Sequence, residues 1–572
     1  MNQTRTFLLL GLLLVAYLLW TAWQEQFHPA LPAVPAQTGQ TAASSVATQP
    51  TVPAMPAAAA EAGPAPTAAA AAAAAAAPLP TPGNARGTRI HVHTDLLDVT
   101  IDSAGGALLR AQLLHYAVQP QQPARVSLLD DHAGHYLVAQ SGLISAAAAP
   151  AADAPFSAGK TDYTLAPGQN RLAVDLTWRD AARGISVIKR YVFTRGSYVV
   201  RVREIVHNSG TAPWTGNAWT QLLRTAPPTP QSHFGFLHDP SSLVFFGAAW
   251  YSPQDKFNKL ALDAFAKHPL NRSVAGGWLA FVQHYFLAAW IPPTQVPYQF
   301  SSAEFRQQGV PYYVLRGVGP TFSVAPGASA SQEQRLYIGP KRPSLLQAAA
   351  PGLDLSVDYG IFTVIAQPLH WILVQLHRIT FNWGLAIILL VLLIKGAFFW
   401  LSDKQYRSMA KMRKLAPRLK ALQERYADDK TKMQQAVVEL YQKEKVNPLS
   451  GCWPMLVQIP VFFALYWVLI ESVELRQAPF MLWIHNLSAP DPYFVLPALN
   501  AGVMLLQQFL TPVAGMDPTQ AKIMKFMPLV MAVFFAVFPA GLVLYYLVNS
   551  LTGVMQQWWV LRQVQRADAA KT

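Results

Sequence analysis

The chain has 572 residues, which is too long for one domain of ordinary size. Lys and Arg number 44 against 30 Asp and Glu, yet only 13% of residues are charged and 52% are hydrophobic. This balance argues against a soluble protein that binds DNA and is typical of a membrane protein whose positive charge lies in loops. The single cysteine, Cys452, excludes a framework of internal disulfides.

The N-terminal residues 1–27 carry Arg5 before an apolar run, Phe7–Trp23. The run is long for a signal peptide and ends in bulky side chains, which favours an uncleaved transmembrane anchor with its N-terminus inside. A cleavage-like ALPA at 30–33 leaves removal of this segment open. Residues 28–86 are rich in Pro and Ala, and they predict a linker.

Residues 87–345 change to the alternating pattern of β-strands. Arg89–Asp102 alternates and ends at a pair of glycines, and residues 185–210 indicate two strands around a turn at Arg195–Ser197. Helical periodicity is scarce here. We expect a large antiparallel β-sandwich, placed on the periplasmic side between the anchor and later spans.

Sequence signatures of enzymes are absent: there is no P-loop, HExxH, GxSxG or CxxC. His91 and His93 flank Val92 on a predicted strand, so both would point to one face. No third metal ligand is evident, which favours surface histidines. We therefore expect no catalytic residue, cofactor or metal. A membrane-tethered carbohydrate enzyme remains an alternative, because the sandwich carries acids and histidines, although no spacing singles any out.

The second half of the chain is apolar and helical. Residues 346–402 predict an amphipathic helix along the membrane surface followed by the second span, and residues 448–564 predict spans three to six. With the anchor this gives six spans, five of them forming the core. The five later spans are expected at Trp383–Leu401, Trp453–Ile470, Phe494–Leu510, Phe526–Phe538 and Gly541–Val560.

Positive residues set the orientation of these spans. Arg5, the loop between spans two and three, Lys522 with Lys525, and the short tail 565–572 all fall on one side, which is therefore cytoplasmic. We expect a multi-pass protein of the cell inner membrane with both termini in the cytoplasm and the β-sandwich in the periplasm.

Residues 403–447 carry a strong positive charge: twelve Lys and Arg stand against six Asp and Glu. Apolar residues at spacings of three and four predict two amphipathic helices around Asp428-Asp429, ended by Asn447-Pro448 and packed as a helical hairpin. The hairpin predicts a docking surface for ribosomal RNA or anionic lipids. The alternative is a solvated face that only enforces topology. Docking residues are expected at its start: Lys404, Arg407, Lys411, Arg413 and Lys414.

Polar residues inside the spans gather at one depth. Lys395, Gln458 and the pair Gln507-Gln508 all lie in the cytoplasmic halves of their spans. Span six carries polar residues at spacings of four, three and four, which share one helix face: Tyr545, Asn549, Thr552 and Gln556. The outer halves are apolar. We expect a polar recess that opens to the cytoplasm, is sealed on the outside, and shelters a hydrophilic segment part-way across.

Each of these residues also has a simpler interpretation. Lys395 could extend its stem to the nearby interface, Gln458 could form an ordinary bond between helices, and Tyr545 and Tyr546 could be packing residues. A small-solute secondary transporter with Lys395 as its binding site is the alternative function. A channel would need polar lining through its full depth, and neither such lining nor an internal repeat is found.

Several long segments resemble the YidC family of bacterial membrane-protein insertases, in its Gram-negative form with a large periplasmic domain. They include NWGLAIILLVLLIKG, DKQYRSMAKMRKLAPRLKALQERY and KIMKFMPLVMAVFFAVFPAGLVLYYLVNS. The resemblance implies five core spans around a hydrophilic groove that opens to cytoplasm and lipid. It also implies insertion of nascent membrane proteins, alone or with the Sec translocon, at the ribosome and without a cofactor.

The resemblance also assigns roles to residues. Lys395 stands where the family usually has the arginine of the groove, so the charge is kept but the guanidinium fork is lost. Gln458 corresponds to a polar contact of the groove, and Tyr545 and Tyr546 to tyrosines that contact substrate. The basic hairpin corresponds to a cytoplasmic hairpin that the family needs for activity.

Overall fold

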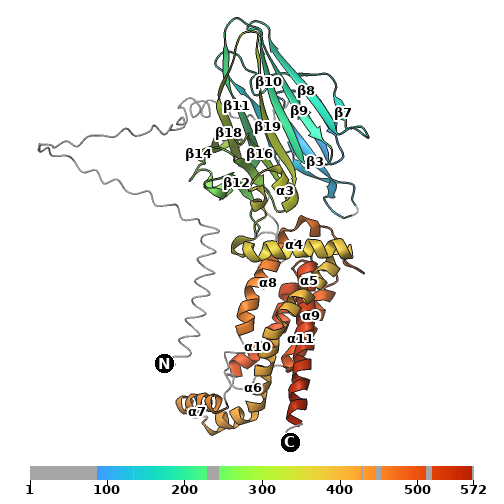
Figure 1. Cartoon of the computed structure of the whole chain (residues 1–572), viewed down its shortest axis with the longest axis vertical. Helices are drawn as coiled ribbons and strands as arrows, with labels where there is room; N and C mark the ends of the chain where they lie inside the picture. The colour runs from blue at the N-terminus through green and yellow to red at the C-terminus, as the bar shows by residue number, and fades with distance from the viewer. Residues whose placement is uncertain are drawn as a thin grey trace, which may run out of the picture. The chain divides into compact units, whose positions relative to one another are not determined.

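The computed structural model describes residues 87–120, 122–132, 134–227, 244–426, 429–444, 453–510 and 518–569 (Figure 1). The predicted anchor and linker, residues 1–86, lie outside the described residues, as do Asp428 and the Asn447-Pro448 pair.

Two sheets make up the region from Arg89 to Pro340. The first has ten strands in the order β14-β17-β18-β11-β5-β3-β2-β1-β7, with β4 beside β3. Its strands are β1 Arg89–His93, β2 Leu97–Asp102, β3 Leu108–Ala117, β4 Arg125–Leu129, β5 Leu137–Ile144, β7 Asp162–Thr164, β11 Trp214–Thr225, β14 Asn271–Val274, β17 Tyr298–Gln307 and β18 Val310–Val324.

The second sheet has nine strands in the order β13-β12-β15-β16-β19-β10-β9-β8-β6. Its strands are β6 Ser157–Ala158, β8 Arg171–Asp180, β9 Ile185–Thr194, β10 Val199–Asn208, β12 Gly247–Ser252, β13 Lys256–Leu260, β15 Trp278–Val282, β16 Phe286–Ile291 and β19 Ser329–Pro340. The strand pairs are antiparallel apart from β1 with β7, which run parallel. The expected antiparallel sandwich is therefore confirmed, with this one exception.

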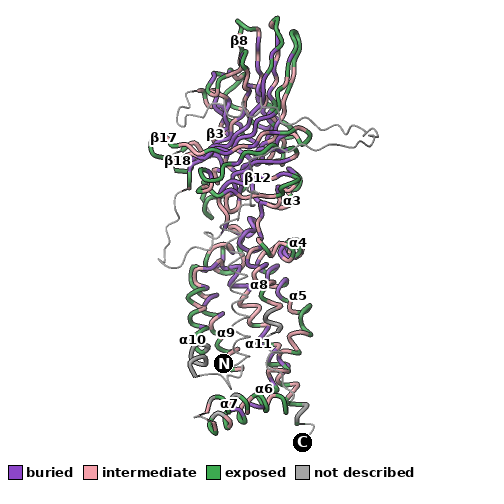
Figure 2. The backbone as a smooth tube through the Cα atoms, turned by 90° about the vertical axis from the view of Figure 1, so that its left-hand side faces the viewer, coloured by how far each residue is buried: buried purple, intermediate pink, exposed green. Residues whose placement is uncertain are grey.

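The strands form where side chains alternate between core and solvent. In β9 every second residue from Ile185 to Phe193 is buried, and β10 pairs with β9 in antiparallel register around the predicted turn. Gly196 in that turn has a φ of 69°, a left-handed conformation that glycine adopts at little cost. Buried residues appear in Figure 2 as a continuous purple layer through both sheets.

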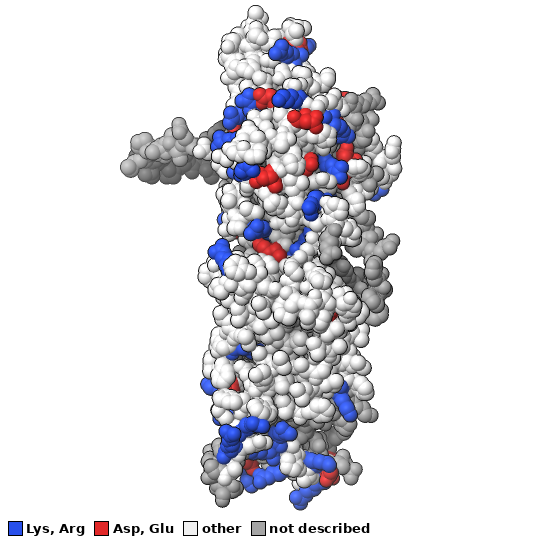
Figure 3. Space-filling model, turned by 90° about the vertical axis from the view of Figure 1, so that its right-hand side faces the viewer, with Lys and Arg blue, Asp and Glu red and all other residues white. Residues whose placement is uncertain are grey.

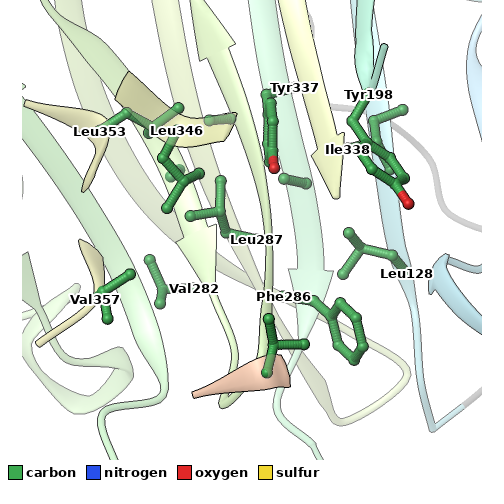
Figure 4. Close-up of a cluster of buried hydrophobic side chains, with 14 of the residues drawn as sticks. Leu128, Tyr198, Val282, Phe286, Leu287, Tyr337, Ile338, Leu346, Leu353 and Val357 are labelled. Atoms are coloured by element: carbon green, nitrogen blue, oxygen red, sulfur yellow. The ribbon is translucent and has the colours of Figure 1, made fainter. Parts of the chain in front are cut away.

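The core of the sandwich continues beyond its last strand. Leu346 of α3 (Pro343–Ala349), Leu353 of the 3-10 turn η3 (Leu353–Ser356) and Val357 are buried in the same cluster as Val282 and Leu287 (Figure 4). The segment after the sandwich is thus packed onto β15 and β16, the strands that carry Val282 and Leu287.

The helices follow from residue 363 onwards. They are α4 Thr363–Thr380, α5 Trp383–Ala397, α6 Phe399–Arg425, α7 Lys430–Lys443, α8 Trp453–Glu471, α9 Val495–Leu510, α10 Pro518–Phe535 and α11 Ala540–Ala569. Short 3-10 turns occur elsewhere in the chain, at η2 Leu262–Ala264, η4 Gly360–Phe362 and η6 Val473–Leu475. Helix α4 contacts α5 and α8. Helix α11 contacts α5, α6, α8 and α9, so it is the central element of the bundle.

Three helix ends differ from the sequence prediction. The second span was expected to continue to Leu401, but α5 ends at Ala397 and α6 leaves at an angle of 68°. Gly396 precedes this break, and the apolar run continues through it to Leu401, so the apolar pattern could not locate the bend. Helix α10 begins at Pro518, before the expected Phe526, and α11 runs to Ala569 through the predicted tail.

Among the described residues, no single helix is both long and apolar enough to cross a membrane alone, whereas α5 and α6 up to Leu422 meet the criterion together as a bent pair.

Two local contacts fix the start of α5 and the connection between α10 and α11. Asn382 caps α5 by accepting a hydrogen bond from the Leu385 amide, and its side-chain amide donates to the Phe480 carbonyl over 2.9 Å. A β-carbon on Gly384 would lie 2.0 Å from the Phe480 ring, so only glycine permits this approach. The short connection between α10 and α11 is held by the Ala540 amide, which donates to the Ala489 carbonyl.

A buried ion pair joins the end of the sandwich to α8. Lys341 follows β19 directly, and its Nζ lies 2.6 Å from a carboxylate oxygen of Glu471, the last residue of α8. Both side chains are 1% exposed. Because neither charge is hydrated, each depends on the other.

Candidate functional site

Lys395 lies in the last turn of α5 with its side chain half-buried. A β-carbon placed on Gly553 of α11 would lie 3.7 Å from Lys395 Nζ, 3.4 Å from the Tyr406 hydroxyl and 4.0 Å from Gln507 Nε2. The ammonium is therefore directed toward α11. Three hydrogen-bond donors, from α5, α6 and α9, meet over a glycine that leaves the space between them free of side chain.

Gln458 and Asn549 form the adjacent part of the site. Gln458 Nε2 on α8 donates a hydrogen bond of 3.1 Å to Asn549 Oδ1 on α11. Gln458 also lines a pocket with Lys395, Phe398 and Ser402. We call Lys395, Tyr406, Gln458, Gln507 and Asn549, together with Gly553, the polar cluster. Its residues come from five helices that are far apart in the chain.

The pocket within the polar cluster is small in this conformation. Its volume is about 20 Å³, which leaves room for about one water molecule. A peptide segment does not fit between α5 and α8 as they stand.

The charge of Lys395 is not matched inside the polar cluster. Among the residues that the structure describes, no carboxylate forms an ion pair with Lys395, and Tyr406, Gln458 and Asn549 are neutral groups. A half-buried ammonium beside neutral dipoles favours an anionic partner, although the pocket next to it has room for only about one water molecule in this conformation.

Two other polar residues predicted on α11 are engaged differently. The Thr552 hydroxyl donates to the backbone carbonyls of Val548, over 2.7 Å, and of Asn549, so it is satisfied within its own helix. Gln556 is half-buried, and its Oε1 is enclosed with no hydrogen-bond partner within the described part of the chain.

Tyr545 and Tyr546 belong to an aromatic layer. The Tyr546 ring lies 4.8 Å from the ring of Phe462 on α8 and 4.5 Å from that of Phe535 on α10. Tyr545 is 4% exposed and stacks beside Phe462. The aromatic layer is completed by Tyr466, Phe534 and Phe538. The aromatic layer lies one helical turn from the polar cluster along α11. The bundle is therefore polar at one level and aromatic at the next.

Sequence reasoning missed two members of the polar cluster. Neither Tyr406 nor Gly553 was among the residues expected at the recess. The bend at Phe398 turns Tyr406 back toward α11, where it is 8% exposed. The available signal was the small residue Gly553 in the polar stripe of α11, since small residues allow close approach of neighbouring helices.

The predicted docking residues all lie on α6, and all five are exposed: Lys404, Arg407, Lys411, Arg413 and Lys414. Arg407 is engaged, because it pairs with Asp403 at 2.7 Å and donates to Gln563 of α11. Lys404 lies 4.9 Å above the ring of Trp400. Lys and Arg gather over this part of the surface in Figure 3, beside a broad area of the bundle with few charges.

The two hairpin helices pack together through the predicted apolar residues. Leu415 and Leu419 of α6 are buried against Val437, Leu440 and Tyr441 of α7. Arg418 of α6 also pairs at 2.6 Å with Glu444, the residue that follows α7, which adds a contact between the two arms of the hairpin.

Within the described residues, no group of three metal-ligating side chains includes His91 or His93. His91 and His93 are exposed on one face of β1, as the alternation predicts, and His93 lies 3.5 Å from Asp98. A compact acidic group occurs elsewhere, where Asp130, Asp131 and His132 bring their ligand atoms within 4.8 Å of one another.

Comparison with known proteins agrees with this two-part organisation. The family profile described as the YidC periplasmic domain matches residues 89–372, and the one described as the 60Kd inner membrane protein matches residues 375–567. The two matches define an inner-membrane protein with a periplasmic domain.

Curated relatives match over most of the chain. A "Membrane protein insertase YidC" of Methylococcus capsulatus is 45% identical over 84% of this chain and 87% of its own. One from Thioalkalivibrio sulfidiphilus is 42% identical over 99% of both chains. A crystal structure described as an active YidC insertase covers 82% of this chain and 92% of its own, with 17% identity and a TM-score of 0.37. The chain belongs to the YidC family.

Proposed function

We propose that the chain is a membrane-protein insertase, which inserts nascent inner-membrane proteins and assists their folding. The observation that carries the proposal is the polar cluster. Five helices bring polar groups and one unmatched ammonium to a single level, and the aromatic layer closes the bundle beside them. The names of the curated relatives support the same function.

The proposed membrane arrangement has six spans, with both termini and the basic hairpin in the cytoplasm. Large apolar side chains exposed on the bundle support it, because soluble surfaces rarely expose them in groups. Leu529, Val530 and Val533 on one side of α10 are 56–65% exposed. Helix α4 exposes Val364, Trp371 and Ile379 on the face opposite its buried residues, which fits a helix lying on a membrane surface.

The proposed mechanism has three parts. The basic hairpin receives an emerging hydrophobic segment at the ribosome or at anionic lipids. The polar cluster then holds the short polar flank of that segment, which lowers the cost of removing it from water. Finally the apolar segment moves along α8 and α11 into lipid, while the flank is released outside. Lys395 attracts acidic residues in the flank, and no catalytic step or cofactor is required.

Access to the polar cluster requires movement, because the pocket beside Lys395 holds about one water molecule. The break between α5 and α6 at Phe398 lies within the same pocket lining. We propose that α6 swings about this break, away from α8, and opens the cluster toward cytoplasm and lipid. Cooperation with the Sec translocon is a further expectation, drawn from the family resemblance.

Site-specific crosslinking tests the proposal. A photoreactive residue at Gln458 or Tyr546 is expected to crosslink a stalled nascent membrane protein, since both positions border the proposed path. The matched control is Leu529, an exposed position on the outer face of α10. Equal labelling from Leu529 and Gln458, or labelling from neither path position, would contradict the proposal.

Solute transport is not favoured by any specific observation. Uptake of a small solute into vesicles by the purified protein, lost on changing Lys395, would support that alternative.

A further inference from the structure

The buried guanidinium of Arg224 in the sandwich lacks an opposite charge. Arg224 is the penultimate residue of β11 and is 4% exposed, yet no carboxylate pairs with it within the described residues. Its Nε donates to the Thr225 carbonyl, whereas its Nη1 is enclosed without a hydrogen-bond partner. A buried charge left in this state is among the costly features of a protein interior.

Aromatic rings supply only part of the compensation. The guanidinium carbon lies 4.2 Å from the ring centre of Phe246 and 5.2 Å from that of Phe281. Such contacts stabilise a cation without satisfying its N–H groups. Burial lowers the pKa of Arg224 to about 9, so the side chain is still charged at neutral pH.

Arg224 borders a cavity that holds further donors. The cavity has a volume of about 130 Å³, the space of roughly four water molecules. Thr225, His135 and Gln283 line it, and the Thr225 hydroxyl is also buried without a partner. Two neighbouring residues that line one cavity therefore each carry an enclosed polar atom without a hydrogen-bond partner.

The single acidic residue in the wall is already occupied. Asp130 Oδ1 accepts hydrogen bonds from the His132 amide, over 3.0 Å, and from His132 Nδ1, over 2.5 Å. This oxygen is therefore engaged by its own loop, whereas Arg224 is the charged residue of the cavity wall that lacks such partners.

We propose that this cavity of the β-sandwich binds a compact oxyanion, a phosphate group, through Arg224 and Thr225. A phosphate has five heavy atoms and suits the volume, and its oxygens accept from a guanidinium fork and a hydroxyl at once. The group could come from free phosphate or from a glycerophosphate headgroup, which present the same chemistry.

Thermal unfolding of the full-length protein in detergent tests the site. Inorganic phosphate, compared with chloride at equal ionic strength, is expected to raise the midpoint by about 2–4 °C once it exceeds its dissociation constant roughly fivefold. Arg224→Met should abolish that shift. Arg171→Gln, at an exposed position of β8, should retain it. No shift in the native protein, or an equal shift in Arg224→Met, would overturn the proposal.

The same variant shows whether Arg224 serves to bind a ligand or to stabilise the fold. Without phosphate, Arg224→Met is expected to unfold at the native temperature or above, because it removes an unpaired buried charge. A lower midpoint would show that the aromatic contacts of Arg224 also stabilise the fold, and the phosphate response of Thr225→Val then decides, because an unchanged response in that variant would overturn the proposal. If Arg224→Met does not fold, Thr225→Val replaces it and should weaken the phosphate response. A larger shift with glycerol 3-phosphate than with phosphate would identify the headgroup as the source.

Discussion

Gln458 on α8 and Asn549 on α11 are joined by a hydrogen bond of 3.1 Å between their side-chain amides. The bond links the two helices along which the substrate segment is proposed to move. Each amide keeps further donor and acceptor capacity, so the pair can hold a polar flank as well as bind the two helices together.

The strength of this pair can be measured with a double-mutant cycle. We expect Gln458→Leu and Asn549→Leu to show a coupling energy of about 0.6 kcal/mol in the free energy of unfolding in detergent, as hydrogen bonds between membrane helices commonly do. Additive effects of the two substitutions would show that the bond contributes nothing to stability.

The charge of Lys395 should govern substrates with acidic flanks. Lys395→Glu is expected to reduce their insertion roughly tenfold or more, because repulsion replaces a charge-assisted hydrogen bond. Lys395→Arg is the matched control and should keep insertion near the native level. Insertion into proteoliposomes, compared for acidic and neutral flanks, measures the effect. Unchanged insertion of every substrate by Lys395→Glu would remove the role assigned to the lysine.

Gly553 offers a way to fill the polar cluster from within. Gly553→Asp would place a carboxylate beside Lys395 Nζ, because the β-carbon lies only 3.7 Å from it. We expect this variant to fold and to block insertion of acidic flanks while sparing neutral ones. Gly553→Ala meets its neighbours at ordinary contact distances of 3.4–4.0 Å and should be nearly silent. A block of equal size in both variants would indicate a steric effect instead.

His370 of α4 should make stability depend on pH. Burial lowers the pKa of His370 below its ordinary 6.5, while Glu474, with Oε2 4.0 Å away, acts weakly in the other direction, and Arg342 adds to the lowering. Tyr359 is the nearest ring. The unfolded chain therefore binds a proton more readily, so stability falls as pH drops below 6.5 toward the lowered pKa.

Thermal unfolding at about pH 7.5 and about pH 5.5 measures this contribution. His370→Gln should show a smaller difference between the two midpoints than the native protein, because glutamine does not titrate. An unchanged difference would assign the pH dependence to other groups.

The buried pair of Lys341 and Glu471 should respond asymmetrically to substitution. Lys341→Met alone leaves the Glu471 carboxylate buried and unpaired, and is expected to cost about 3–5 kcal/mol of stability. The double variant Lys341→Met with Glu471→Leu should recover most of that loss. Denaturant unfolding of the full chain checks both values, and a double variant as unstable as the single one would contradict the argument.

Local sequence patterns predicted the sandwich well because each strand can be recognised from its own sequence. Alternation in β9 and β10 placed two strands and their turn correctly, since burial of every second side chain is a property of the segment alone. The hairpin helices were predicted for the same reason, through the spacing of Leu415, Leu419 and Leu440. The parallel pairing of β1 with β7 was not, because pairing depends on distant residues.

The polar cluster shows where sequence reasoning ends. The positions of Lys395, Gln458 and Asn549 along their predicted spans were enough to predict, from the sequence alone, that they lie at one level. Tyr406 was missed because its position depends on the bend at Phe398, which no change in composition marks. Tyr545 was grouped with the polar stripe by spacing, but its ring is enclosed by Phe462, a tertiary contact that spacing does not encode.

The contact between Arg407 and Gln563 has a mechanical consequence. Gln563 lies ten residues beyond Gly553 on the same unbroken helix, about 15 Å along its axis. A binding partner that displaces α6 would therefore rotate or tilt α11 as well. This movement would change the distance between Gly553 and Lys395. Binding of a substrate at the basic hairpin and opening of the polar cluster would then be coupled in a single movement.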